Sequence, residues 1–134
     1  MKLFCAYAFT GEDIAVLTER MRLVVDTLES NGHTAYCNRF DPIVDELQAA
    51  NDIKGIFQEA FKNIQQSEAV VAVIASPNRS IGQIMEIGVA LSQSKPVYLL
   101  EHISAEGSTY LPRLVHNYQQ WRTTEDLKTA LLKI

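Results

Sequence analysis

The stretch AVVAVIASPNRSIGQIMEIGVA, residues 69–90, decides the fold. Its first part, Ala69–Ala75, is short, uncharged and rich in β-branched residues, which is typical of a strand buried on both faces. The Pro, Asn and Ser residues that follow end this strand and open a helix that begins near Ile81. A buried strand, a small-residue loop and a helix in this order predict an α/β protein with a parallel sheet.

Glu86 lies within the first two turns of the predicted helix. Free backbone N–H groups make a helix N-terminus a favourable place for an anion, and open α/β sheets bind ligands at the carboxyl ends of their strands. Two interpretations therefore stay open. Glu86 is either a reactive carboxylate in a ligand site or a residue that only stabilises the helix dipole.

Two apolar stripes run along this helix at helical spacing. The stripe that we expect to lie on the sheet consists of Ile84, Ile87, Gly88 and Leu91. The second stripe consists of Ile81, Met85 and Val89, with Glu86 beside it and away from the sheet. A helix that is apolar on two sides is usually covered on both, which predicts a homodimer or a larger homo-oligomer. A covering loop, or a helix sunk in its own domain, are the alternatives.

The composition predicts one globular domain over residues 1–134, because 47% of the residues are hydrophobic and 21% are charged. A net charge of −4 without a basic run argues against nucleic acid and against an anionic membrane surface as partners. No apolar run approaches the roughly 20 residues of a membrane span. The chain begins directly with an expected strand and shows no signal-peptide pattern, so we expect a cytoplasmic protein.

The cysteines and histidines do not indicate a metal site. Cys5 and Cys37 both fall in expected strands, where they are typical of buried thiols in a reducing compartment. His33, His102 and His116 have no ligand spacing among them. We therefore predict neither a disulfide nor a bound metal.

Strand and helix patterns alternate along the whole chain. Strands are predicted at residues 3–8, 33–37, 69–75, 95–100 and 118–121, and helices at 14–28, 53–64, 81–91 and 123–132. Residues 38–50 are expected to form a long loop that helps to cover a site at the sheet edge of Thr10 and Ser80. This alternation predicts a flavodoxin-like three-layer fold with about five parallel strands and right-handed crossovers. The first turn, AYAFTG, lacks the three-glycine fingerprint of a dinucleotide site.

The segment SIGQIMEIGVALSQSK, residues 80–95, resembles the nucleoside 2-deoxyribosyltransferase family, which includes the 2′-deoxynucleoside 5′-monophosphate N-glycosidases. The likeness spans most of residues 2–100, and residues 118–121 match the family's late strand. It implies that Glu86 is a nucleophile, which attacks the anomeric carbon as the base leaves and forms a glycosyl-enzyme ester. Water or a second base then releases the sugar, and no cofactor is needed.

The resemblance also implies substrate contacts at the helix start. Ser80 stands where the transferases tend to carry Asp and the monophosphate hydrolases carry Ser, and a neutral hydroxyl there tolerates a 5′-phosphate. Ser80 and Gly82 would hold that phosphate. Tyr7 and Phe9 would line the base or sugar pocket. The remaining expected contacts are Thr10 and Glu68.

The sequence departs from the family pattern at five positions. Leu3 replaces a Tyr that positions the nucleophile, Ala60 replaces an Asp that protonates the leaving base, and Ile84 replaces a Gly. Tyr7 and Phe9 replace a Ser and an Arg that bind phosphate in the hydrolases. Candidates for the missing roles are Glu59, Glu68 and Tyr7.

Two alternative functions stay open. The segments FCAYAFTGED, residues 4–13, and ASPN, residues 75–78, also resemble TIR domains, which use a Glu to cleave the nicotinamide glycosidic bond of NAD. The third hypothesis is a non-catalytic nucleotide-binding or sensing module that kept the cleft and lost the acid. All three place a nucleoside or nucleotide at the carboxyl edge of the sheet.

Overall fold

The computed structural model describes residues 1–134. The strands are β1 (Lys2–Tyr7), β2 (Thr34–Tyr36), β3 (Ala69–Ile74), β4 (Val97–His102) and β5 (Asn117–Trp121). The helices are α1 (Ile14–Ser30), α2 (Pro42–Ala49), α3 (Ile53–Gln65), α4 (Ile81–Ser92), α5 (Leu111–Leu114) and α6 (Thr124–Leu131). Two short 3₁₀ turns are η1 (Asn38–Phe40) and η2 (Ile103–Ala105). None of the helices combines the length and the apolar character that a membrane crossing requires.

All five strands form one parallel sheet in the order β2-β1-β3-β4-β5. This order confirms the predicted flavodoxin-like fold, with β3 fully buried at the centre of the sheet. The strand order changes direction between β1 and β3, because β2 is added on one side of β1 and the later strands on the other. A crevice is expected at the carboxyl ends of these two strands.

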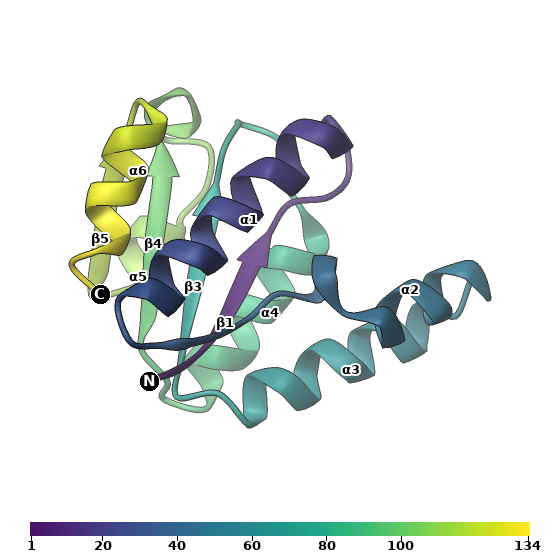
Figure 1. The fold of residues 1–134 in the computed structure, drawn as a ribbon. Coiled ribbons are helices and arrows are strands. Elements are labelled where there is room, and N and C mark those ends of the chain that lie inside the picture. Colours follow the sequence, from purple (N-terminus) through teal and green to yellow (C-terminus); the bar gives the residue numbers. More distant parts are fainter.

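Helices cover both faces of the sheet, as Figure 1 shows. On one face α1 and α6 pack over a core that includes Met21, Leu28 and Leu131. On the other face α3, α4 and α5 cover a core that includes Ile64 and Ile87. Both cysteines are buried and unpaired. Both faces of the central strands β1, β3 and β4 are therefore covered, and a ligand can reach their backbone only at the strand ends.

The expectation of a loop over residues 38–50 was wrong, because this segment forms η1 and α2. Asp41 caps α2 through its Oδ1, which accepts a hydrogen bond from the Ile43 N–H at 2.9 Å, and Pro42 occupies the first helical turn. An Asp followed by Pro is a known helix start. Figure 1 shows α2 and α3 side by side, projecting beyond the end of the sheet.

The predicted orientation of α4 was correct for Ile87 and Leu91, which pack in the core, but wrong for Ile84, Gly88 and Glu86. Its buried positions are Gln83, Glu86, Ile87 and Ala90. Of the stripe expected on the sheet, Ile84 is 37% exposed, and Gly88 is exposed as well. The helix is rotated because Gln83 and Glu86 face the strand ends, so Glu86 lies on the sheet side and not away from it.

Lys95 joins α3 to the loop that precedes β4. Its ammonium group donates hydrogen bonds to the backbone oxygens of Ile64, Gln65 and Ser67 at 2.6–2.7 Å. These carbonyls lie at the C-terminal end of α3, where a cation also interacts favourably with the helix dipole. Lys95 thus completes the end of α3 just before the central strand begins.

We predict that Lys95→Met lowers the free energy of unfolding by about 1–3 kcal/mol, because it leaves three carbonyl groups without their charged donor. Urea unfolding followed by circular dichroism measures the change. Lys133→Met, at an exposed lysine near the C-terminus, is the matched control and should change the stability by less than about 0.5 kcal/mol. Equal stabilities of the two variants would contradict this role of Lys95.

Candidate functional site

A cavity of about 390 Å³ opens at the carboxyl ends of β1 and β3, where the strand order reverses. Its walls come from the end of β1, from η1 and α2, from α3 and from the first turns of α4. The predicted site residues Tyr7, Phe9, Thr10, Ser80, Gly82 and Glu86 all line it. The reversal of strand order therefore gathers residues that lie up to 79 positions apart in the sequence.

Glu86 is 7% exposed and belongs to the cavity wall. Burial raises the pKa of its carboxyl group from 4.5 to about 8, and no protein hydrogen bond or charge contributes to the shift. A carboxylate that only stabilised the helix dipole would be expected in the first turn of the helix and exposed to solvent. Glu86 instead lies in the second turn of α4, and its carboxyl group is open to the cavity without a protein partner.

Gln83 lies one turn before Glu86 on the same face of α4 and was not predicted as a site residue. Its Nε2 donates hydrogen bonds to the Val73 oxygen at 2.9 Å and to the Ala6 oxygen at 3.3 Å. These carbonyls belong to the next-to-last residues of β3 and β1, so one side chain bridges the two strands at the crevice. The signal was a polar residue at helical spacing from Glu86 and Ile87.

The N-terminus of α4 faces the cavity through Ser80 and Gly82. Ser80 is the N-cap, and its Oγ accepts a hydrogen bond from the Gln83 N–H at 3.2 Å. The first intrahelical bond runs from the Ile84 N–H to the Ser80 oxygen. The N–H groups of Ile81 and Gly82 are therefore left for a ligand, as expected for an anion or hydroxyl site at a helix start.

Residues 38–50, which the sequence predicted to be a loop, form the far wall of the cavity as η1 and α2. They contribute Asn38 and Arg39 of η1 and Asp45 of α2, with Phe57 of α3 beside them. The Arg39 Nε donates to Thr18 Oγ1 at 3.0 Å, which leaves its other N–H groups without a protein partner. Ala60, where the family pattern has an acid, is 2% exposed and also lines the cavity.

Tyr7, Phe9 and Thr10 form the side of the cavity that follows β1. Burial raises the pKa of the Tyr7 phenol, and Cys37 and Glu86 raise it further. The phenol therefore stays protonated and can donate a hydrogen bond to a ligand. Phe9 is 39% exposed at the mouth, where an aromatic ring can pack on a sugar or base.

Two hydrogen bonds join the loop after β1 to the loop after β3. Ser76 Oγ donates to Glu12 Oε1 at 2.6 Å, and Asn78 Nδ2 donates to the Gly11 oxygen at 3.4 Å. Gly11 has a φ of +80°, a conformation that side-chain-bearing residues rarely adopt. These contacts fix the two loops beside the cavity.

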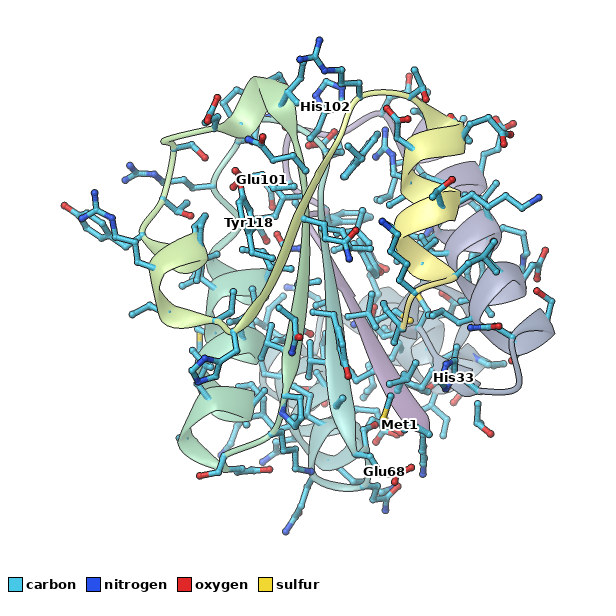
Figure 2. All side chains as sticks on the ribbon, turned by 90° about the vertical axis from the view of Figure 1, so that its left-hand side faces the viewer. Met1, His33, Glu68, Glu101, His102 and Tyr118 are labelled. Atoms are coloured by element: carbon cyan, nitrogen blue, oxygen red, sulfur yellow. The ribbon has the colours of Figure 1, made fainter.

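The structure does not bring Glu68 into the site. Its Oε2 accepts a hydrogen bond from the Lys2 N–H at 2.6 Å, at the amino edge of the sheet. Figure 2 shows Glu68 near Met1 and His33, at the end of the sheet opposite Glu101 and His102. A residue that precedes a parallel strand lies at the edge opposite the one that binds ligands. The expectation that Glu68 contacts substrate is therefore not supported by its position.

Three other residues named from the family pattern or its substitutes lie outside the cavity. Leu3 is fully buried in the core under α1. Glu59 accepts a hydrogen bond from Asn63 Nδ2 at 3.2 Å on α3. Ile84 faces outward from α4. Of the candidates for the missing acid, only Tyr7 reaches the cavity.

A flavodoxin-like α/β protein with a small-molecule cavity at the β1/β3 crossover is the class that this fold and site define. The model of the nucleoside 2-deoxyribosyltransferase family matches residues 5–112, so the chain belongs to that family. No curated protein sequence matches the chain significantly.

Solved structures share the fold over nearly the whole chain. A CMP N-glycosidase of Clostridium botulinum is 18% identical with a TM-score of 0.68, and the match covers 98% of each chain. A 2-deoxyribosyltransferase of Bacillus psychrosaccharolyticus is 20% identical with a TM-score of 0.71, covering 96% of this chain and 90% of that one. A phosphoheptose isomerase of Neisseria gonorrhoeae is 13% identical with a TM-score of 0.61, covering 98% and 75%.

We predict that Glu86→Gln stabilises the protein increasingly as the pH rises. The folded state holds the Glu86 proton up to about pH 8, whereas the unfolded chain releases it near pH 4.5. Stability of the natural protein therefore falls as the pH rises through this window, and the neutral amide escapes the loss. Thermal unfolding at pH 5, 7 and 9 should show a gain for Glu86→Gln that grows to about 1–4 kcal/mol at pH 9. A difference that does not change with pH would contradict the buried environment of Glu86.

Proposed function

We propose that this protein cleaves or transfers at the N-glycosidic bond of a nucleoside or nucleoside 5′-monophosphate, with Glu86 as the nucleophile. One observation carries the proposal. In a member of this family, a buried carboxyl group without a protein partner faces a cavity of about 390 Å³ at the β1/β3 crossover. That volume lies toward the lower end of the roughly 300–1,000 Å³ typical of small-molecule sites.

The first step forms a glycosyl ester. The ionised Glu86 carboxylate attacks the anomeric carbon, the carbon–nitrogen bond breaks, and its electron pair leaves with the base, which takes up a proton. The transition state has oxocarbenium character, which an anion held at close range stabilises. The raised pKa of Glu86 means that this anion is poorly solvated, so it is a stronger nucleophile once ionised.

The second step regenerates Glu86. A water molecule, or the nitrogen of a second base, attacks the anomeric carbon and the ester bond to Glu86 breaks. The incoming group loses a proton and the carboxylate is restored. Which acceptor reacts decides between hydrolysis and transfer.

The other cavity residues have complementary roles in this proposal. Ser80 and the free N–H groups at the start of α4 hold the 5′-hydroxyl or 5′-phosphate. Tyr7 donates a hydrogen bond beside Glu86, and Phe9 packs on the substrate at the mouth. Asp45 of α2 is the second carboxylate that lines the cavity, and this proposal gives it the part of assisting the departure of the base, which Ala60 cannot fill.

We predict that Glu86→Gln lowers the rate of base release by at least about 10³-fold, because covalent catalysis cannot proceed without the attacking carboxylate. Nucleotide binding should persist. Chromatography for free base measures the reaction on a panel of nucleosides, their 5′-monophosphates and NAD. Glu46→Gln, an exposed glutamate of α2, is the matched control and should retain full activity.

The panel also separates the alternatives. Release of base from nucleosides or monophosphates supports the proposal, whereas release of nicotinamide from NAD alone would support the TIR-like function. Binding of a nucleotide without cleavage of any substrate would favour the sensing module. Full activity of Glu86→Gln would exclude the nucleophile.

We also propose that the protein forms a homodimer through the outer side of α4. Ile81, Ile84 and Met85 are 76%, 37% and 44% exposed, which is unusual for aliphatic side chains on one helix face. Tyr110 and Leu114 of the α5 region extend this surface, because they line a second cavity of about 410 Å³ together with Ile84. A continuous exposed apolar patch is typical of an interface between subunits.

We predict that Met85→Glu converts the dimer into a monomer at micromolar concentration, because it places a charge within the apolar interface. Light scattering coupled to size-exclusion chromatography measures the mass. Val16→Glu, at a 52% exposed apolar position on α1, should leave the dimer intact. A natural protein that is already monomeric would exclude this assembly.

A further inference from the structure

We propose that Gln83 recognises the 2′-hydroxyl of the substrate, so that the site selects ribosyl over 2′-deoxyribosyl substrates. This inference rests on the proposed function, because it names the sugar that the same site accepts. The geometry of the Gln83 amide carries it, and neither the family pattern nor the resemblance assigns that residue.

The orientation of the Gln83 amide is fixed by its partners. Both of its contacts, Ala6 and Val73, are carbonyl oxygens, so the group that faces them must be the NH₂. The two N–H bonds are thereby used and the amide cannot flip. Its Oε1 then points the other way, as an acceptor that receives no hydrogen bond from the protein.

The free oxygen is open to the cavity. Gln83 is 4% exposed and lines the cavity. The buried side-chain oxygens that are sealed off without a partner are Asn38 Oδ1 and Glu101 Oε2, so Gln83 Oε1 is not one of them. An acceptor held rigidly in a nearly dry site is costly to leave unpaired when a ligand displaces water.

The position of this oxygen relative to Glu86 identifies its partner. Residues three apart on a helix have their Cβ atoms about 5–6 Å apart on one face, so Gln83 and Glu86 line the cavity next to each other. Glu86 must approach the anomeric carbon from the side opposite the base. In a ribonucleoside the 2′- and 3′-hydroxyls lie on that same side of the sugar ring, and the 2′-hydroxyl is on the carbon next to the reacting one.

A hydroxyl donor and a fixed acceptor therefore meet beside the nucleophile. A 2′-deoxy substrate carries no donor at that carbon and would leave Gln83 Oε1 unpaired and cut off from water. Sites built to hydrogen-bond a substrate hydroxyl discriminate strongly against the analogue that lacks it. The same amide ties β1 to β3, so the acceptor is held by the sheet itself.

Binding to the Glu86→Gln variant tests the inference without interference from the different reactivity of the two sugars. Calorimetry compares adenosine and cytidine 5′-monophosphates with their 2′-deoxy and 3′-deoxy counterparts. We expect the 2′-deoxy compounds to bind at least about tenfold more weakly than the ribonucleotides. The 3′-deoxy compounds should lose less than the 2′-deoxy compounds do.

A second variant assigns the effect to Gln83. In the Glu86→Gln background, Gln83→Met should bring the ratio between ribo- and 2′-deoxyribonucleotide affinities close to one. Gln93→Met, at an exposed glutamine after the end of α4, should leave the ratio unchanged. If Gln83→Met fails to fold, equal binding of ribo- and 2′-deoxyribonucleotides with Gln83 intact would still overturn the inference.

The outcomes separate this inference from the proposed function. Equal binding of ribo- and 2′-deoxyribonucleotides, or a larger loss for the 3′-deoxy compounds, overturns the role of Gln83 and leaves the proposed function standing. Absence of nucleotide binding, together with absence of base release by the natural protein, overturns both.

Discussion

The arrangement of the site depends on the two hydrogen bonds that Gln83 donates to the Ala6 and Val73 oxygens, because they hold α4 against the ends of β1 and β3. Where the strand order reverses, the chain leaves β1 toward α1 on one face of the sheet and leaves β3 toward α4 on the other. Carbonyl groups at these strand ends need a donor. Gln83 supplies one for each strand, and in doing so it sets the rotation of α4 about its axis.

That rotation explains the burial of Glu86. With Gln83 held against the strand ends, the residue one turn later must face the same crevice. The carboxyl group gains no protein partner there, and burial raises its pKa to about 8. Such an arrangement lowers stability at neutral and alkaline pH. A group that is buried at a cost to folding, and placed in a cleft, is characteristic of a functional site.

The sheet and its strand order could be predicted from sequence because they follow from strong local signals. The uninterrupted apolar run of β3, and the alternation of strand and helix patterns, leave few arrangements of a parallel sheet. Glu86, Ser80 and Tyr7 were predicted to share a site for the same reason, since all three follow or lie near the carboxyl end of a strand. Glu68 precedes its strand, so it lies at the other edge.

The errors have physical causes as well. The stripe of Ile84, Ile87, Gly88 and Leu91 suggested the sheet face of α4, but Ile84 and Gly88 are exposed, and the polar residues Gln83 and Glu86 are buried in their place. Hydrophobic periodicity cannot distinguish an apolar surface that packs on the sheet from one available to a partner. The polarity of residues 38–50 suggested a loop because α2 projects beyond the sheet and buries only Val44.

The placement of α2 has a chemical consequence that the family pattern does not anticipate. Ala60 removes an acid from the α3 wall of the cavity, while Tyr7, the one candidate replacement there, has a phenol pKa that is raised by burial and by Glu86. A phenol of that kind donates hydrogen bonds well and transfers protons poorly at neutral pH. Asp45 on α2 is then the second carboxyl group that lines the cavity. Because α2 buries only Val44, whereas α4 is tied to the sheet through Gln83, the two carboxyl groups of the cavity lie on elements that are anchored to different degrees.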